Sequence, residues 1–339
     1  MFSTVLQELK GYFGRDFMLS AFFPLLIFTG ASLALFLEIT QGLGTVLALW
    51  EKLSALAQVV ALLSGLVIVA FLAYLIDNFQ YSIMRLFEGY WSHIPLLSRL
   101  RNLRVELYKN RWEHLNALAQ SAGTLTEANE IIAEQLAFYP PPNHLDKMMP
   151  TQIGNILRAA ELHAYDRYGI DSTIIWSRLR PLLKSEAIAP LEDKKTTLEL
   201  MLLMSLLGIL FVIIWCPVLA IFTNRWDLFL LCALGLPLAW ICYQNAVQSA
   251  LAYGEQVKAT FDLYRNDLLK ALNRPIPSDT ETERKEWLRL SRFFYRNLPI
   301  PPSPPTQAKP NGWNRIANAL ADYLEKLSPP DDRRKEEQQ

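Results

Sequence analysis

The chain has 339 residues, of which 51% are hydrophobic, and its 33 Lys and Arg residues are balanced by 33 Asp and Glu residues. A formal net charge of zero argues against the basic surface that nonspecific nucleic-acid binding requires, so we expect no nucleic-acid partner. The three cysteines, Cys216, Cys232 and Cys242, all lie in apolar runs. Their odd number gives no disulfide framework, and we expect them to be ordinary core side chains.

Four apolar runs are long enough to cross a membrane. The clearest one, residues 53–76, contains no Asp, Glu, Lys, Arg or His. About 20 apolar residues at 1.5 Å per residue match the roughly 30 Å hydrocarbon core of a bilayer. The other three runs cover residues 17–37, 198–222 and 228–244. We therefore expect an all-α integral membrane protein with four transmembrane helices in two hairpins and an α-helical cytoplasmic domain.

Prolines and small residues interrupt the apolar runs. A proline inside a spanning helix frees a backbone carbonyl and bends the helix, and small residues let helices pack closely or line a pore. The candidate pore or kink positions are Pro24, Ser64, Gly65, Pro217, Gly235 and Pro237. We expect residues 38–51 to form a connection broken by Gly42 and Gly44. No ionisable residue lies near the middle of a run, which argues against a secondary transporter.

The domain organisation follows from these runs and from the polar stretches between them. The expected parts are an amphipathic lead-in (1–16), a first transmembrane hairpin (17–76), a cytoplasmic helical domain (77–196), a second transmembrane hairpin (197–245), cytoplasmic helices (246–298), a Pro-rich linker (299–310), an amphipathic C-terminal helix (311–327) and a disordered tail (328–339). No signal-peptide cleavage pattern follows the first run, so we expect it to remain as an anchor.

The polar region 77–196 shows helical patterns and no strand-like alternation of useful length. The second apolar helix is expected to continue past residue 77. Thr124 and Glu127 resemble a capping box that opens a helix ending near Phe138. Another helix is expected to start at Pro150 and Thr151 and to break near Tyr168.

The distribution of Lys and Arg predicts the orientation. The two hairpin loops carry only Lys52 and Arg225, whereas most other basic residues lie in the polar regions. The positive-inside rule therefore places both termini and region 77–196 in the cytoplasm. The expected location is the inner, or plasma, membrane.

Three short blocks resemble a pattern found in uncharacterised bacterial multi-pass membrane proteins. They are "RLFEGY" (Arg85 to Tyr90), the segment from Gly154 to Leu179 with "YGID" inside it, and "AYGE…FDLYRNDLL" (Ala252 to Leu269). The resemblance implies a four-span bacterial inner-membrane protein, and it supplies no activity.

One segment concentrates the residues that could form a ligand or partner site. The candidates are Asn155, Glu161, His163, Asp166, Arg167, Tyr168 and Asp171. The carboxylates with His163 are compatible with an acid/base or metal cluster, but Glu161 and His163 are two residues apart and face different sides of a helix. The alternative is structural, with Asp166, Arg167 and Asp171 capping a helix end and pairing with their neighbours. No zinc-binding spacing is present, and we expect no catalytic residue, cofactor or metal.

Three functions remain open at this stage. The first is a non-enzymatic anchor, scaffold or signalling protein whose cytoplasmic domain binds a partner. The second is a homo-oligomeric channel or pore gated by that domain. The third and weakest is a juxtamembrane enzyme using Glu161, Asp166 and Asp171. The expected partners are the lipid bilayer, further copies of the chain, and a cytoplasmic protein bound through the C-terminal helix.

Overall fold

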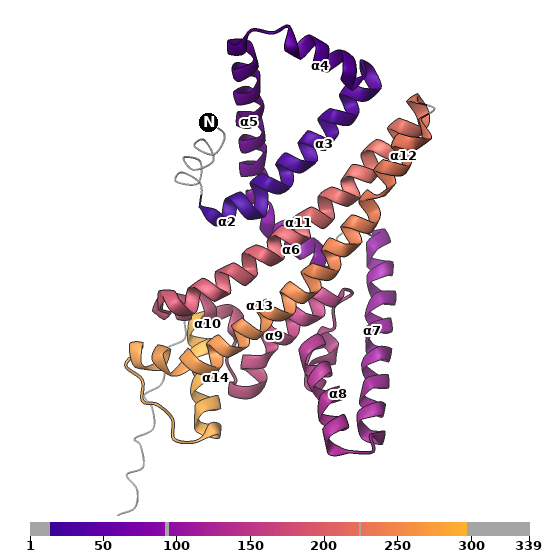
Figure 1. The fold of residues 1–339 in the computed structure, drawn as a ribbon. Helices are drawn as coiled ribbons and strands as arrows, with labels where there is room; N and C mark the ends of the chain where they lie inside the picture. The colour runs from indigo at the N-terminus through magenta and orange to yellow at the C-terminus, as the bar shows by residue number, and fades with distance from the viewer. Residues whose placement is uncertain (1–13, 92–94, 224, 297–339) are drawn as a thin grey trace, which may run out of the picture. The chain divides into compact units, whose positions relative to one another are not determined.

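The computed structural model describes residues 14–91, 95–223 and 225–296, and every regular element within these ranges is helical (Figure 1). Contacts group the chain into residues 1–291 and 292–339, and the contacts discussed below lie within the first group. The expected linker, C-terminal helix and tail lie outside the described residues, as does most of the lead-in. Within the described residues, four helical stretches are long and apolar enough to cross a membrane. They are Arg15–Thr40, Ala55–Asn78, Ser185–Phe222 and Trp226–Ala271.

The first candidate span changes helix type along its length. α2 (Arg15–Phe17) leads into a π-helical turn, η1 (Met18–Phe22), which is followed by α3 (Phe23–Thr40). Pro24 stands at the start of α3. A π-helical turn is a recognised cause of local helix distortion. The chain therefore departs from regular α-helix immediately before the proline, where the backbone donor is missing.

The connection between the first two candidate spans is more ordered than the sequence predicts. Residues 38–51 contain a helix, α4 (Leu43–Glu51), and Gly44 lies inside it. Gly42 is the residue that interrupts the helix, with φ at +76°, in the left-handed region that favours glycine. The Glu38 carboxylate accepts a hydrogen bond from the first N–H of α4 at 2.9 Å. That bond satisfies a donor that has no partner within the helix, which is why α4 begins here.

The second candidate span does not continue unbroken into the polar region. α5 (Ala55–Asn78) begins after Ser54, whose hydroxyl caps its first turn. The helix breaks at Phe79 (φ −95°, ψ 1°), and a separate helix, α6 (Gln80–Glu88), follows. The prediction that the second helix continues past residue 77 without interruption is therefore wrong, because the helix breaks at Phe79. α6 ends at Gly89, at φ +95°.

The next two helices form an antiparallel pair. α7 (Pro95–Ser121) and α8 (Leu125–Phe138) are joined by a short turn. The expected capping box is confirmed, because the Thr124 hydroxyl accepts a hydrogen bond from the Glu127 N–H at 3.2 Å. The Glu127 carboxylate in turn accepts one from the Gly123 N–H at 3.3 Å, one residue earlier than the usual box.

Shorter helices complete the polar region. A 3₁₀ turn, η2 (Pro142–Lys147), precedes α9 (Gln152–Tyr168), and α10 (Ser172–Leu179) is followed by a second 3₁₀ turn, η3 (Arg180–Leu182). α9 ends at Gly169, where φ is +75°. This left-handed residue turns the chain sharply, so that α10 packs back on α9.

Two very long helices link the apolar and polar regions. α11 (Ser185–Phe222) has 38 residues, and α13 (Gly235–Ala271) has 37. α12 (Trp226–Ala233) joins them, with a break at Leu234. α14 (Thr280–Arg296) closes the described chain. α11 and α13 each run unbroken from a candidate span into the polar region.

One hydrophobic core spans both regions. α11 and α13 approach closely because both carry glycine where they meet: a Cβ on Gly208 would lie 3.0 Å from the Cβ of Ala239. α9 packs on the polar half of α13. The buried cluster includes Met18, Phe22, Val69, Ile83, Ile153, Ile156, Leu198, Leu202, Ala246 and Val247. Its members come from both regions, so the two regions are packed as one unit.

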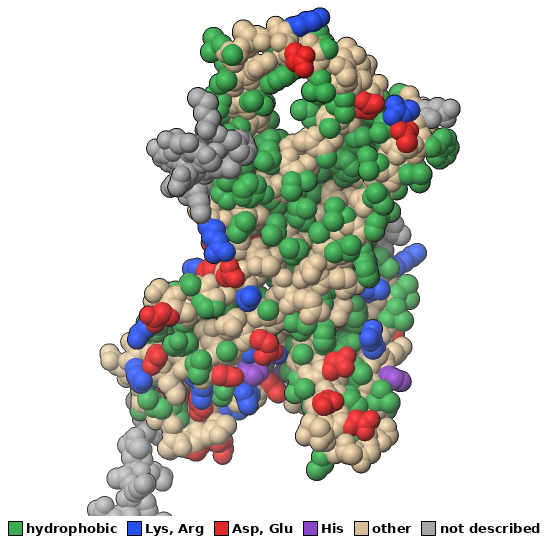
Figure 2. All heavy atoms as spheres, in the orientation of Figure 1, with side chains coloured by type: hydrophobic (Ala, Val, Ile, Leu, Met, Phe, Trp, Pro, Cys, Tyr) green, Lys and Arg blue, Asp and Glu red, His purple; other side chains and the backbone are tan. Residues whose placement is uncertain are grey.

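Side-chain chemistry divides along the same line. Figure 2 shows hydrophobic side chains dominating the face formed by α3, α5 and the upper parts of α11 and α13, whereas charged side chains gather around α8, α10 and α14. A bilayer accepts an apolar surface and excludes a charged one. The apolar surface therefore coincides with helices that are long and apolar enough to cross a membrane.

Candidate functional site

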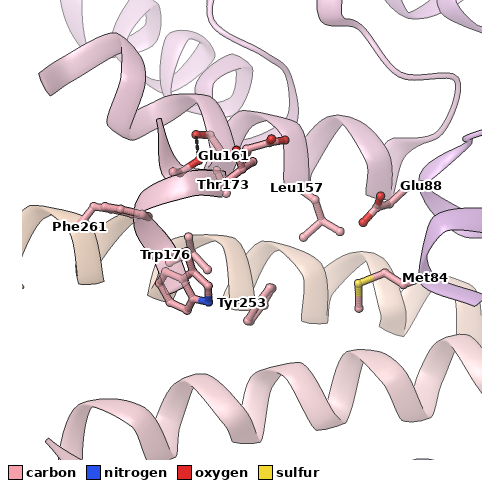
Figure 3. Close-up of a pocket in the computed structure, with 11 residues that line it drawn as sticks. Met84, Glu88, Leu157, Glu161, Thr173, Trp176, Tyr253 and Phe261 are labelled. Atoms are coloured by element: carbon pink, nitrogen blue, oxygen red, sulfur yellow. Dashed lines mark hydrogen bonds between the residues drawn. The ribbon is translucent and has the colours of Figure 1, made fainter. Parts of the chain in front are cut away.

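An open pocket lies where the two regions meet, and we call it the junction pocket (Figure 3). Its volume is about 280 Å³. Residues of α6, α9, α10 and α13 line it, among them Glu88, Leu157, Trp176 and Tyr253. The volume lies just below the usual range for ligand pockets, about 300–1,000 Å³, and so suits a small molecule.

Aromatic rings form one wall of the junction pocket. Trp176 of α10 packs against Phe261 of α13 with ring centroids 5.8 Å apart and planes tilted by 47°. Tyr253 lies two helical turns before Phe261 on α13, and Figure 3 shows its ring near that of Trp176. Leu157 adds an aliphatic surface. Such a wall suits an apolar ligand, and the faces of aromatic rings also attract cations.

Two carboxylates, Glu88 and Glu161, lie on the pocket lining. Glu161 pairs with Arg158 at 2.5 Å, and Arg158 also donates a hydrogen bond to the Tyr90 hydroxyl at 2.7 Å. Glu88 is half-buried, and its carboxylate makes no hydrogen bond or ion pair within the described residues. Burial raises the pKa of Glu88 above its ordinary value of 4.5, despite the nearby charges of Arg85 and Arg158. Glu88 is therefore a partly desolvated acid with room for a cationic partner.

Backbone packing fixes the position of Glu88. Its carbonyl accepts a hydrogen bond from the Thr151 hydroxyl at 3.0 Å, and the same hydroxyl caps α9 by accepting the Gly154 N–H at 3.0 Å. A Cβ on Gly154 would lie only 2.1 Å from the Glu88 carbonyl oxygen. Only glycine allows the two backbones to approach this closely. The end of α6 is thus clamped to the start of α9.

Asn155 has a structural role in this clamp. It is fully buried, and its amide bonds both backbone groups of Met149: it accepts from the N–H at 2.7 Å and donates to the carbonyl at 2.9 Å. All of this hydrogen bonding is internal. The structure therefore places Asn155 outside the junction pocket, where it holds the turn before α9.

His163, Arg167 and Tyr168 converge on one residue that the sequence analysis did not select, Asp262 of α13. The Asp262 carboxylate lies 3.0 Å from His163 Nε2 and 3.4 Å from the Arg167 guanidinium, and it accepts a hydrogen bond from the Tyr168 hydroxyl at 2.8 Å. Burial and this hydrogen bond both raise the pKa of Tyr168, so the phenol stays protonated as a donor. Arg265 stacks over the Tyr168 ring at 4.0 Å. The cluster fastens α9 to α13.

Asp262 lies in the block from Ala252 to Leu269, one of the three that carry the family resemblance. Its place in that block is the one sequence feature that marks Asp262 as a candidate site residue. His163 and Asp262 are 99 residues apart in the chain, however. No periodicity within either segment indicates that α9 and α13 pack together, so the pairing appears only in the structure.

The remaining candidate carboxylates do not join Glu161. Asp171 caps α10, accepting hydrogen bonds from the Thr173 and Ile174 N–H groups at 3.2 and 3.4 Å. Asp166 takes part through its backbone carbonyl, which accepts a hydrogen bond from Arg284 at 2.8 Å. Glu161 thus lines the pocket, Asp171 caps a helix, and Asp166 contacts α14. The three carboxylates do not form an acid/base cluster.

Some candidate pore or kink positions lie at helix breaks or helix contacts, and others face open space. Gly235 follows the break between α12 and α13, and Pro237 lies in the first turn of α13, while Pro217 is inside an unbroken α11. A Cβ on Gly235 would lie 2.7 Å from Val212, so this glycine serves helix packing. Gly65, next to Ser64, faces open space: a Cβ added there meets no atom within 4 Å.

Within ranges 14–91, 95–223 and 225–296, no group of three His, Cys, Asp or Glu residues is arranged to hold a metal ion. Cys216 and Cys232 lie with their sulfurs 3.4 Å apart, as free thiols between α11 and α12.

The described residues form an all-α structure with four helices suited to crossing a membrane and a small amphiphilic pocket at their junction with a polar helical region. Comparisons with protein-family models, curated proteins and solved structures find no match to the chain.

Proposed function

We propose that the chain is a non-enzymatic integral membrane protein whose cytoplasmic helical domain binds a partner, and that recognition takes place at the junction pocket. The observation that carries the proposal is the composition of the pocket wall. α6 follows the second candidate span and α13 forms most of the fourth, whereas α9 and α10 belong to the polar region. A molecule in the pocket contacts both regions at once, so its binding is coupled to the relative position of the spans and the domain.

The proposed location is a plasma membrane, the inner membrane in a bacterium, with both termini and region 77–196 in the cytoplasm. The positive-inside rule supports this orientation, since the turns at α4 and before α12 carry few basic residues. The charged surface around α8, α10 and α14 is then the aqueous side.

The proposed ligand is a small organic cation with an apolar body. Glu88 supplies a negative charge without an ion pair among the described residues, whereas Arg158 already neutralises Glu161. Trp176, Tyr253 and Phe261 supply aromatic surface for a cationic head group. An anionic ligand would be repelled by the Glu88 carboxylate, which makes the pocket selective by charge.

The absence of an assembled acid/base cluster supports a binding role over catalysis. Of the three carboxylates in the enzyme hypothesis, Glu161 is paired with Arg158 and Asp171 caps a helix. A general acid or base needs hydrogen-bond reach to a shared substrate. The three residues do not converge on one position.

A direct test compares two probes of similar size on the full chain in lipid nanodiscs, using isothermal titration calorimetry. We expect saturable binding of benzyltrimethylammonium and none of phenylmethanesulfonate. Glu88→Gln should weaken ammonium binding about tenfold, because it removes the unpaired charge. Glu130→Gln, an exposed carboxylate on α8, is the matched control and should leave binding unchanged. Equal binding of both probes, or no effect of Glu88→Gln, would overturn the proposal.

A homo-oligomeric channel is the second candidate, and one observation favours it. Of the four candidate spans α5 is the least buried, and Gly65 on it faces open space. An exposed helix with small residues is suited to pack against another copy around an axis. Ion flux through proteoliposomes tests it: flux that Gly65→Leu abolishes supports a pore, and no flux under any ion gradient removes this candidate.

A further inference from the structure

α7 carries an apolar stripe that its own chain leaves uncovered. Leu100, Leu103 and Leu107 are 45%, 66% and 60% exposed. Their spacing of three and four residues is that of the a and d positions of a heptad repeat. Three large leucines on one exposed helical face outside the candidate spans are unusual for a surface in contact with water.

The opposite face of α7 is the one that packs on its own domain. Tyr108 contacts Tyr139 with ring centroids 6.3 Å apart, and the Gln135 amide donates a hydrogen bond to the Trp112 carbonyl at 3.1 Å. The leucine stripe therefore points away from α8 and is free to meet another molecule.

Charged residues flank the stripe in an arrangement that indicates what it meets. With Leu100 and Leu107 at a positions, Glu106 occupies a g position and Arg111 the next e position. Both are exposed, and neither forms an ion pair within the part of the chain that the structure describes. In a parallel two-stranded coiled coil, a g residue of one helix meets the following e residue of the other. Glu106 and Arg111 are complementary in this geometry.

We propose that the leucine stripe of α7 pairs with the same stripe of a second copy of this chain, as a short parallel coiled coil. The inference rests on the proposed membrane topology. In the proposed arrangement α7 runs along the membrane normal. Copies inserted in one membrane in the same orientation are related by rotation about this normal, so their α7 helices then run in the same direction. Glu106 of each copy then pairs with Arg111 of the partner subunit. The polar residues Asn110 and His114 occupy the next two seam positions and end the apolar pairing.

One feature opposes parallel pairing, and two others offset it. Arg99 and Arg104 occupy the preceding g and e positions, where like charges would meet. The Arg104 guanidinium is held on its own chain, however, donating to the Pro150 carbonyl at 3.4 Å and to the Tyr108 hydroxyl at 3.4 Å. A coiled coil this short is weak in solution, but confinement of both copies to one membrane raises their effective concentration.

Disulfide crosslinking in native membranes tests the pairing. In a chain whose three cysteines are replaced by alanine, Leu103→Cys should form a covalent dimer on mild oxidation. Asn102→Cys, one residue away on a different face of α7, should not. Crosslinking at both positions indicates random collision, and crosslinking at neither excludes the contact, so either result overturns the proposal.

Charge exchange tests the register. On the Leu103→Cys background, Arg111→Glu should reduce the crosslinked fraction roughly fivefold, since each Glu106 then faces a glutamate of the partner subunit. Adding Glu106→Arg should restore it, because the pairs re-form with reversed sign. A double variant that crosslinks as poorly as the single one would overturn the parallel register.

Titration of the same variants with benzyltrimethylammonium separates the two proposals. Loss of crosslinking with binding retained removes only the pairing, and loss of binding alone removes only the ligand proposal.

Discussion

Glu88 illustrates how the position of a single residue sets its chemistry. The side chain follows a conformationally fixed backbone, because the Glu88 carbonyl is held by Thr151 and Gly154. Its carboxylate is partly desolvated and has no ion pair among the described residues to compensate for lost hydration. Keeping the Glu88 carboxylate ionised therefore costs free energy in the unliganded protein. A bound cation would remove that cost, and this gain would contribute to its binding free energy.

This placement predicts a particular pH dependence of stability. The folded-state pKa of Glu88 is raised above the ordinary 4.5. Its contribution to stability is therefore complete below pH 4.5 and is lost as the pH rises through the folded-state value. Glu88→Gln, which cannot ionise, should raise the unfolding temperature relative to the parent at pH 7 and have little effect at pH 4. Thermal unfolding in nanodiscs from pH 4 to pH 8 measures the difference.

Glu130→Gln is again the control, because an exposed carboxylate without a described partner should show no such trend. A stabilisation by Glu88→Gln that is the same at pH 4 and pH 7 would mean that ionisation of Glu88 is not the cause.

At the scale of elements, the junction pocket depends on the clamp between α6 and α9. Gly154→Ala places a methyl group 2.1 Å from the Glu88 carbonyl oxygen, so the helices must separate. We expect a loss of about 2–3 kcal/mol in stability, and loss of ammonium binding, because overpacking of rigid backbone is costly. Unfolding temperature and calorimetric titration report the two effects.

Gly65→Ala is the matched control for this change. The new methyl group meets nothing within 4 Å and lies within a helix, so stability and ligand binding should both be kept. Unchanged ammonium binding by Gly154→Ala would show that the clamp does not shape the pocket.

The sequence predicts most helices well, because their signals are local. The capping box at Thr124, the stop at Tyr168 and Gly169, and the four apolar runs are each visible within a short window. The sequence does not predict α4, because a short segment with two glycines is typical of a loop. The break at Phe79 has no glycine or proline to mark it.

The site is less accessible to sequence reasoning, because its residues meet across long separations. Glu161 is among the predicted site residues and lines the pocket, but Glu88, Trp176 and Tyr253 are not among them. His163 and Tyr168 are also predicted site residues, and their partner Asp262 is nearly 100 positions away. Tertiary packing decides which faces of α6, α9 and α13 meet. The sequence pattern of each helix does not predict these contacts.

At the scale of the whole molecule, the proposed orientation predicts which surface faces each side of the membrane. In a chain with its native cysteines replaced, Glu51→Cys on α4 should react with a membrane-impermeant maleimide added outside intact spheroplasts. Ser177→Cys on α10 should react only after the membrane is permeabilised. Both positions are exposed, so accessibility of the compartment decides the result. The reverse pattern would invert the topology, and the proposed cytoplasmic location of the domain would be wrong.

The unbroken length of α11 and α13 has a mechanical consequence. At 1.5 Å per residue each helix is about 55 Å long, and the two are in close backbone contact at Gly208 and Gly235. Such a pair acts as a lever arm: a tilt of about 5° at the lipid end displaces the other end by about 5 Å. A bilayer that thickens, thins or stretches would thereby move the helix that carries Tyr253, Phe261 and Asp262, with no hinge along α13 to absorb the motion.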